Sequence, residues 1–394
     1  MAERMRVQQS DLSAVGSNTP AGAYLRRYWQ PVMRAQDLPL GRAKPLEILG
    51  EKFTIYRGES GEPHIVQQRC AHRGVPLHLG WVQGDDLRCR YHGWKYDCTG
   101  KCIEMPNNSR VQDVQLRKHP AREYLGFIFA YLGEGAAPAF PRIPPMDQPG
   151  VIVTDPIEVV PATFWNRLDN DIDHIPWTHR HTAEKIGMND LLIPRVVAPA
   201  EESAWGWTST REKRVGGEGV RRNSGYSLYM IMPNILLFTV RTRAKGFEGR
   251  ELWDTKITWT VPVNDSTFIA FDATLTPLEG DEARAYLAAR AGQQEPEALI
   301  RWPLAEQILA GELTIEDIPD GTSGYNRFAI EDYATQVGQG QIEGRSEHLV
   351  ETDCDILLTR RLWQREVSAM LDGRSLTNWD YGKLPKFINE QVAA

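Results

Sequence analysis

The chain has 394 residues, of which 41% are hydrophobic and 25% charged, so it is long enough for two globular domains of ordinary size. A net charge of -7 provides no basic surface for nucleic acid or an anionic membrane. No apolar run is long enough to span a bilayer and the first residues lack a signal-peptide core, so we expect a cytoplasmic protein. Five cysteines are too few for a disulfide scaffold, which favours metal binding or catalysis for any that cluster.

The expected elements divide the chain into an N-terminal segment and two domains. Residues 17–40 predict a short capped helix and a Pro-bounded connection, within a segment 1–44 that we expect to pack with the later domain. Short alternating runs separated by turn residues predict a small antiparallel β-domain over 45–140. After a proline-rich linker at 136–150, strand-like runs mix with helical ones over 151–394. This mixture predicts an antiparallel sheet with helices packed on it, and an α+β fold class overall.

The first candidate site is the pattern C-x-H-x16-C-x2-H formed by Cys70, His72, Cys89 and His92. Thiolates and imidazoles together bind zinc or iron–sulfur clusters, and the long gap allows a hairpin to bring two ligand-bearing turns together. A structural Cys2His2 zinc site is one interpretation. The other is a Rieske [2Fe–2S] centre, favoured because each half pairs one cysteine with one histidine. The surroundings, C-x-H-R-G and C-x-Y-H-G-W, resemble the Rieske signature, which implies cysteines on one iron and histidines on the other.

The remaining thiols and the nearby histidine are expected to be structural. Cys98 and Cys102 follow the motif closely, but its four ligands are already complete, so we expect them and Cys354 to be inert. His78 is expected to pack or form a hydrogen bond. No glycine-rich fingerprint for a nucleotide follows a strand, so any electrons from a nicotinamide would come through another protein.

The second candidate site is the pattern D-x2-H-x4-H formed by Asp171, His174 and His179. On a regular helix His174 and His179 would point about 140° apart, but Pro176 between them predicts a break that lets them converge. Two histidines and one carboxylate with open positions make the triad of non-haem Fe(II) oxygenases. His181 is the rival for His179.

The carboxylate ligand is expected later in the chain. Asp332, beside Glu331, lies on a predicted helix, where the alternative interpretation is an acid favoured by the first helical turn. The same Ile-Glu-Asp triplet also occurs at 315–317, but Pro319 follows closely, which predicts a loop there. The sequence by itself leaves the choice between ligand and first-turn acid open.

Together these motifs resemble the catalytic α subunit of a Rieske non-haem iron (aromatic-ring-hydroxylating) oxygenase. The segments NTPAGAYLRRYWQPV and QGQIEGRSEHLVETD are similar to the phthalate-dioxygenase-like branch. The resemblance implies a Rieske β-domain followed by a helix-grip catalytic domain, assembled as a homotrimer. It also implies that mononuclear iron is held by His174, His179 and Asp332. Asp171 would bridge His174 and, across a subunit boundary, His92 of a neighbouring subunit.

The chain departs from the family pattern next to the expected bridge. Many relatives carry an asparagine three or four positions before the bridging acid, where this chain has Leu168 and Arg167. Asn166 and Asn170 are nearby but shifted. We therefore expect the electron path or the helix register to differ locally.

The resemblance implies a terminal oxygenase that uses O2, with electrons from NAD(P)H through a separate reductase or ferredoxin, to hydroxylate or dihydroxylate an aromatic substrate. Demethylation or aryl-ether cleavage is the alternative outcome. The strand predicted at 226–238 is expected to line the pocket, where Arg241 or Arg243 could clamp a carboxylate or simply face solvent. A zinc-stabilised binding protein is the alternative from another class. A simple electron carrier would leave the residues after the linker unexplained.

Overall fold

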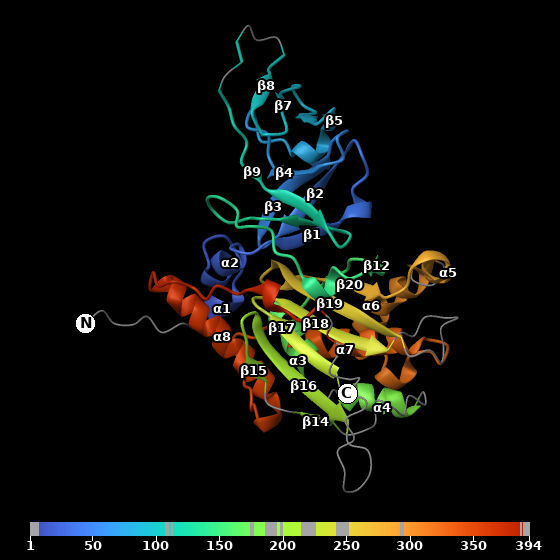
Figure 1. The fold of residues 1–394 in the computed structure, drawn as a ribbon. Coiled ribbons are helices and arrows are strands. Elements are labelled where there is room, and N and C mark those ends of the chain that lie inside the picture. Colours follow the sequence, from blue (N-terminus) through green and yellow to red (C-terminus); the bar gives the residue numbers. More distant parts are fainter. Residues whose placement is uncertain are drawn as a thin grey trace, which may run out of the picture. The chain divides into compact units, whose positions relative to one another are not determined.

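The computed structural model divides the chain into two compact units (Figure 1). The N-terminal unit comprises Ala14–Pro141 and Val261–Asp265, and the C-terminal unit comprises Met1–Ser13, Arg142–Thr260 and Ser266–Ala394. The expected segment 1–44 is therefore shared between the units, most of it grouping with the β-domain. The residues described by the structure are 8–106, 110–111, 113–173, 177–185, 195–197, 200–213, 226–241, 252–291, 295–386 and 388.

Three small antiparallel sheets make up most of the N-terminal unit. The first has the order β1 (Gln30–Arg34), β11 (Phe127–Ala130), β10 (Ala121–Tyr124). The second has the order β2 (Arg42–Ile48), β3 (Glu51–Arg57), β4 (Pro63–Gln67), β9 (Lys118–His119). The third has the order β5 (Trp81–Gln83), β6 (Asp86–Arg88), β7 (Lys95–Tyr96), β8 (Cys102–Glu104). The predicted β-domain is confirmed, and so is the capped helix, α2 (Pro20–Leu25), which begins after Thr19.

A tight turn explains why residues far along the chain belong to the N-terminal unit. Strands β2 and β3 are joined at Leu49 and Gly50, whose φ angles are 51° and 72°. Positive φ at both central residues is the hairpin geometry that matches strand twist, although leucine rarely adopts it. The amide of Leu49 donates to the carbonyl of Pro262 at 2.9 Å and that of Gly50 to the carbonyl of Val263 at 2.7 Å. These two bonds hold the turn and tie the segment 261–265 to it.

A large antiparallel sheet forms the framework of the C-terminal unit. Its main path is β12 (Val151–Thr154), β20 (Thr267–Thr276), β19 (Trp253–Asn264), β18 (Ile235–Arg241), β17 (Tyr226–Ile231), β16 (Gly206–Lys213), β14 (Arg195–Val197). Two short strands pair beside this path, β13 (Val159–Val160) with β20 and β15 (Glu201–Glu202) with β16. The predicted antiparallel sheet of the later domain is thus confirmed.

Helices accompany this sheet, which makes the unit α+β as predicted. The helices are α1 (Gln9–Ser13), α3 (Phe164–Ile172), α4 (Trp177–Lys185), α5 (Gly280–Ala291), α6 (Glu295–Leu309), α7 (Gly324–Gly338) and α8 (Cys354–Leu371). Helix α7 packs against α3, α4 and α6, and α3 also packs against α8. In the part of the chain that the structure describes, none of the helices combines the length and apolar character required to cross a bilayer.

The prediction of a single strand over 226–238 is wrong. The segment forms a hairpin, in which β17 and β18 pair from Ile231 opposite Ile235, and a turn contains the cis Met232–Pro233 bond. Proline cannot donate a ladder hydrogen bond, so a central strand cannot continue through Pro233. Successive side chains of the hairpin are buried, which shows that both faces of these strands are covered.

Two sets of contacts fix helix α3 in the core. Trp165 on α3 lies 5.1 Å from Trp363 on α8, measured between ring centroids. The side-chain amide of Asn166 donates to the carbonyls of Gln336 at 2.7 Å and Gly340 at 2.9 Å, where α7 ends. Because these carbonyls lack helical partners, the fully buried Asn166 satisfies them and fixes α3 relative to α7.

We predict that Leu362→Ala destabilises the protein far more than Leu357→Ala, although both lie on α8. The Leu362 side chain is 1% exposed and that of Leu357 is 41% exposed. A buried Leu→Ala change costs about 2–5 kcal/mol, equivalent to a fall in melting temperature of roughly 5–15 °C. The Leu357 variant should melt within about 2 °C of the wild type, because exposed substitutions usually cost under about 0.5 kcal/mol. Thermal denaturation followed by circular dichroism measures both. Equal shifts would contradict the assigned packing of α8.

Candidate functional site

The two cysteine–histidine loops of the N-terminal unit are built in the same way. Cys70 follows β4 and Cys89 directly follows β6. In each loop the amide of the glycine four residues on donates to the cysteine carbonyl, at 2.9 Å for Gly74 and 3.2 Å for Gly93. The two glycines have φ angles of 74° and 72°, which few other residues adopt. The repeated turn explains the shared glycine in C-x-H-R-G and C-x-Y-H-G-W.

The four side chains of these loops form two pairs. Cys70 and Cys89 are 3% and 2% exposed, whereas His72 is exposed and His92 half-buried. The two imidazole ring centroids are 4.7 Å apart, and the ring of His72 stacks on Trp94 at 4.6 Å. Burial raises the pKa of the Cys89 thiol and the neighbouring Cys70 thiol raises it further, while amide donors from Tyr91 and His92 oppose this. The sulfur atoms therefore face the interior and the imidazoles face outward.

The pairing of cysteine with cysteine and of histidine with histidine helps to identify the metal group that the loops can hold. Within the described residues, no group of three or more His, Cys, Asp or Glu side chains is placed to hold one ion. A tetrahedral Cys2His2 zinc site needs all four ligands around one metal. A Rieske cluster needs only two residues on each iron, two cysteines on one and two histidines on the other. The observed pairs therefore fit the binuclear cluster better than zinc.

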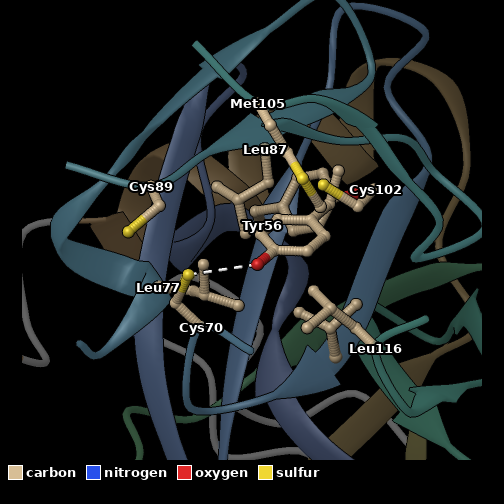
Figure 2. Close-up of a cluster of buried hydrophobic side chains, with 10 residues drawn as sticks. Tyr56, Cys70, Leu77, Leu87, Cys89, Cys102, Met105 and Leu116 are labelled. Atoms are coloured by element: carbon tan, nitrogen blue, oxygen red, sulfur yellow. Dashed lines mark hydrogen bonds between the residues drawn. The ribbon is translucent and has the colours of Figure 1, made fainter. Parts of the chain in front are cut away.

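The sulfur pair lies in a buried hydrophobic cluster. Figure 2 shows the sulfur atoms of Cys70 and Cys89 on one side of this cluster and Cys102 on the other. The hydroxyl of Tyr96, which is 1% exposed, lies 3.1 Å from the Sγ atom of Cys70. Cys98, Cys102 and Cys354 are likewise free thiols. Cys102 reaches only the carbonyl of Glu104, at 3.6 Å, in keeping with a structural role.

The second pattern spans an interruption between two helices. Helix α3 ends at Ile172, the backbone at Asp173 is extended with ψ at 146°, and α4 begins at Trp177. Asp171 and His179 therefore lie on separate helices, and the part that Pro176 plays in this interruption stays a prediction. His174 and Pro176 lie outside the described residues, as does the side chain of His179. The structure consequently describes the positions that flank the expected iron ligands.

Asp171 lies in a buried group of charges. Its Oδ2 atom is 3.0 Å from the Nε atom of Arg167, one helical turn earlier. Burial raises the pKa of Asp171 to about 7, Arg167 lowers it, and Asp272 on β20 and Asp332 on α7 raise it. Burial opposes the charge of Arg167, but together the carboxylates raise the pKa of its guanidinium. Among described residues no aligned hydrogen-bond donor reaches Asp171 Oδ2, so the atom retains capacity for a donor from the segment that follows α3.

Asp332 lies at the middle of α7, next to α3. The helix begins at Gly324, so the interpretation of Asp332 as a first-turn acid is wrong. The side-chain amide of Asn170 on α3 donates to Asp332 Oδ1 at 3.4 Å. Helix packing, which is not visible in a local pattern, therefore brings the later acid to the helix that carries Asp171.

The rival residues are engaged elsewhere. The ring of His181 is exposed, and its Nε2 atom lies 3.0 Å from Oε1 of Glu316. Residues 315–317 form a single 3-10 turn, as expected for a loop, in which Asp317 Oδ2 accepts the amide of Thr314 at 2.8 Å. Glu331 accepts a short hydrogen bond from the Thr182 hydroxyl on α4. These contacts leave Asp332 as the better-placed acid.

Sequence reasoning noticed Arg167 and Asn170 only as departures from a pattern. It did not anticipate that Arg167 would pair with Asp171 or that Asn170 would reach Asp332. The i,i+4 spacing of Arg167 and Asp171 could have been tested once α3 was predicted, since residues four apart share a helix face. Asp272 was missed altogether, because it is on a strand about one hundred residues away along the chain and has no distinguishing neighbours.

Comparisons with known proteins agree with this geometry. The Rieske [2Fe-2S] domain family matches residues 28–116. The chain is 28% identical over 387 residues to phenoxybenzoate dioxygenase subunit alpha of Ectopseudomonas oleovorans, covering 92% of this chain and 85% of that protein. It is 38% identical over 202 residues to the 3-chlorobenzoate-3,4-dioxygenase oxygenase subunit of Comamonas testosteroni, covering 48% and 46%. The structure of NdmA from Pseudomonas putida CBB5 shares the fold, with a TM-score of 0.62, 18% identity and coverage of 93% and 94%.

The combination of a Rieske β-domain with an antiparallel sheet and its helices is the architecture of one class of proteins, the iron–sulfur oxidoreductases. Over most of its length the chain is similar to catalytic α subunits of Rieske non-haem iron oxygenases. Its cofactors are a Rieske [2Fe–2S] cluster and a mononuclear iron, and its enzyme class is that of the oxygenases. The family and fold inferred from the sequence are thereby confirmed.

We predict that Tyr96→Phe lowers the reduction potential of the cluster. A hydrogen bond to a ligand sulfur stabilises the more negative reduced state. Losing about 0.5–1.5 kcal/mol of hydrogen bonding corresponds to roughly 20–65 mV for a one-electron couple. Tyr56→Phe is the matched control, because Tyr56 is in the same buried cluster but its hydroxyl donates to the carbonyl of Asp85 at 3.3 Å. Redox titration monitored by EPR measures both, and equal potentials for the two variants would refute the role of Tyr96.

Proposed function

We propose that this chain is the terminal oxygenase component of a multicomponent Rieske oxygenase. It uses O2 and electrons from NAD(P)H, delivered by a separate reductase or ferredoxin, to hydroxylate or dihydroxylate an aromatic substrate. The observation that carries the proposal is the coexistence of two metal-type sites in one chain. Paired cysteine and histidine loops lie in one unit, and an interrupted α3–α4 helix pair lies beside Asp332 of α7 in the other.

In the N-terminal unit, the buried thiolates of Cys70 and Cys89 would hold one iron and the imidazoles of His72 and His92 the other. When bound, this group supplies one electron at a time. The protein keeps the sulfur atoms away from water and leaves the histidine side accessible. This polarity supports electron exchange through the imidazole edge.

In the C-terminal unit, His174, His179 and Asp332 would hold the mononuclear iron. The interruption between α3 and α4 supports this assignment, since α3 ends at Ile172, before His174, and His179 lies on α4. Asn170 restrains the Asp332 carboxylate by donating to Oδ1. When bound, an iron with three protein ligands supplies open positions for O2 beside the substrate.

Asp171 would link the two centres. Its Oδ2 atom is buried and has no aligned donor among the described residues, and His174 follows three positions later. An acid there can accept a ring N–H from a metal-bound histidine and so fix the ring orientation. In a homotrimer it would also accept one from His92 of a neighbouring subunit, which fits the outward-facing imidazoles.

The names of relatives support an aromatic substrate. They include phenoxybenzoate, 3-chlorobenzoate and phthalate dioxygenase subunits, all named for aromatic carboxylates. Arg241 and Arg243 would be the candidates for binding such a carboxylate, although their side chains lie outside the described residues. A demethylase is the second candidate, because the chain is 31% identical over 188 residues to a 5,5'-dehydrodivanillate O-demethylase oxygenase subunit of Sphingobium sp.. Product analysis under labelled O2 with benzoate, phthalate, aryl-ether and methoxy-aromatic compounds separates these outcomes.

We predict that Asp332→Ala abolishes turnover and lowers the iron content while the cluster remains intact. The reason is the loss of one of three ligands to the mononuclear iron. Asp317→Ala is the matched control, because Asp317 ends an identical Ile-Glu-Asp triplet but caps an exposed turn. Iron analysis, EPR of the reduced cluster and product formation distinguish the two variants. If the Asp332 variant kept its iron and its turnover, the ligand assignment would be wrong.

The histidines offer a second matched pair for the same test. His179→Ala should lose mononuclear iron, whereas His181→Ala should keep it, because His181 pairs with Glu316 at the surface. The opposite result would make His181 the ligand. A colourless purified protein that contained only zinc would remove the oxygenase proposal and favour a zinc-stabilised binding protein.

A further inference from the structure

We propose that Arg167 is a positioning residue that holds the Asp171 carboxylate in place between the two metal centres. The inference rests on the proposed function and adds a residue to it. Arg167 touches neither substrate nor iron in this assignment. It acts through Asp171.

The geometry places a single guanidinium among carboxylates from three elements. Arg167 and Asp171 are one turn apart on α3, with 3.0 Å between Nε and Oδ2. Asp272 from β20 and Asp332 from α7 lie close enough to act electrostatically on Arg167. The side chains of Arg167 and Asp171 are 23% and 10% exposed, so water screens this group weakly.

Three like charges at close range require a fixed cation. Each carboxylate destabilises the others in a medium of low dielectric, and removal of one partner of a buried pair is strongly destabilising. Asp272 has the Thr258 hydroxyl at 2.5 Å, and Asp332 has the Asn170 amide at 3.4 Å. For Asp171 the corresponding contact is the ion pair with Arg167. An arginine suits this role because it remains charged under all physiological conditions.

The ion pair with Arg167 leaves Asp171 able to accept a hydrogen bond from another group. The 3.0 Å approach of Arg167 Nε involves one of the two carboxylate oxygens, and each carboxylate oxygen can accept more than one hydrogen bond. Asp171 thus keeps a lone pair for a histidine N–H.

The same helix provides an internal comparison. Asp169, two residues before Asp171, forms a buried ion pair with Arg360 of α8. Arg360 also contacts Glu347, with Nη1 at 2.5 Å from Oε2. This second pair ties α3 to α8 and has no contact with Asp171 or Asp332 among the described residues. Replacing Arg360 therefore controls for the loss of a buried arginine that does not contact Asp171.

The test compares Arg167→Met, Arg167→Lys and Arg360→Met in the holoenzyme. The main readout is the rate at which the prereduced cluster is reoxidised by O2 in the presence of substrate, followed by stopped-flow absorbance. Iron content, cluster EPR and melting temperature are measured on the same samples. We expect Arg167→Met to keep its cluster and iron and to slow reoxidation at least tenfold. Arg167→Lys should recover part of the rate, and Arg360→Met should lower the melting temperature with reoxidation unchanged.

Several outcomes would overturn the inference. It fails if Arg167→Met reoxidises its cluster at the wild-type rate, or if the lysine variant is no faster than the methionine variant. Should Arg167→Met not fold, Arg167→Lys against Arg360→Lys decides, with a loss of at least threefold expected only for the former. Failure of the proposed function itself is recognisable separately, because the wild-type protein would then show no substrate-dependent reoxidation by O2.

Discussion

Buried negative charge on helix α3 is the constraint around which the C-terminal unit is organised. Asp169 and Asp171 both lie in the interior, where a carboxylate without a partner takes up a proton or destabilises the fold. Each has an arginine, Arg360 from α8 for the first and Arg167 from α3 itself for the second. One ion pair connects two helices, and the other lies within α3, where Asp171 is next to the last residue of the helix. The same electrostatic requirement is met once by a tertiary contact and once within a single helix.

The two candidate metal sites differ in how the chain constructs them. In the N-terminal unit, each half-site is a short turn closed by a glycine with positive φ, so the ligands and the backbone that positions them are neighbours in sequence. In the C-terminal unit, Asp332 approaches α3 only because α7 packs there and Asn166 ties the end of α7 to α3. The first kind of site depends on local conformation, and the second on the whole core.

This difference explains what the sequence could predict. The cysteine–histidine spacing, an interruption between Asp171 and His179 and the short 315–317 turn could be predicted, because proline, glycine and capping residues act within a few positions. Asp332 could be placed on a helix but not at its middle, since helix ends are poorly marked. The hairpin at Pro233 was missed although proline argued against a continuous strand. The contacts of Asp272 and Asn170 were beyond prediction, because they join residues more than one hundred positions apart.

A guanidinium beside Asp171 balances the charge of this carboxylate differently from a neutral amide. An amide donates a neutral hydrogen bond and leaves the charge of the acid to be balanced by the metals and their histidines. A permanent cation balances that charge before any metal binds, at the cost of desolvating one more ion. The surrounding carboxylates offset this cost, since they stabilise the charged form of Arg167. Arg167 thus opposes the effect of burial, which raises the pKa of Asp171 to about 7, and it restrains the carboxylate with a charge that is present before any metal binds.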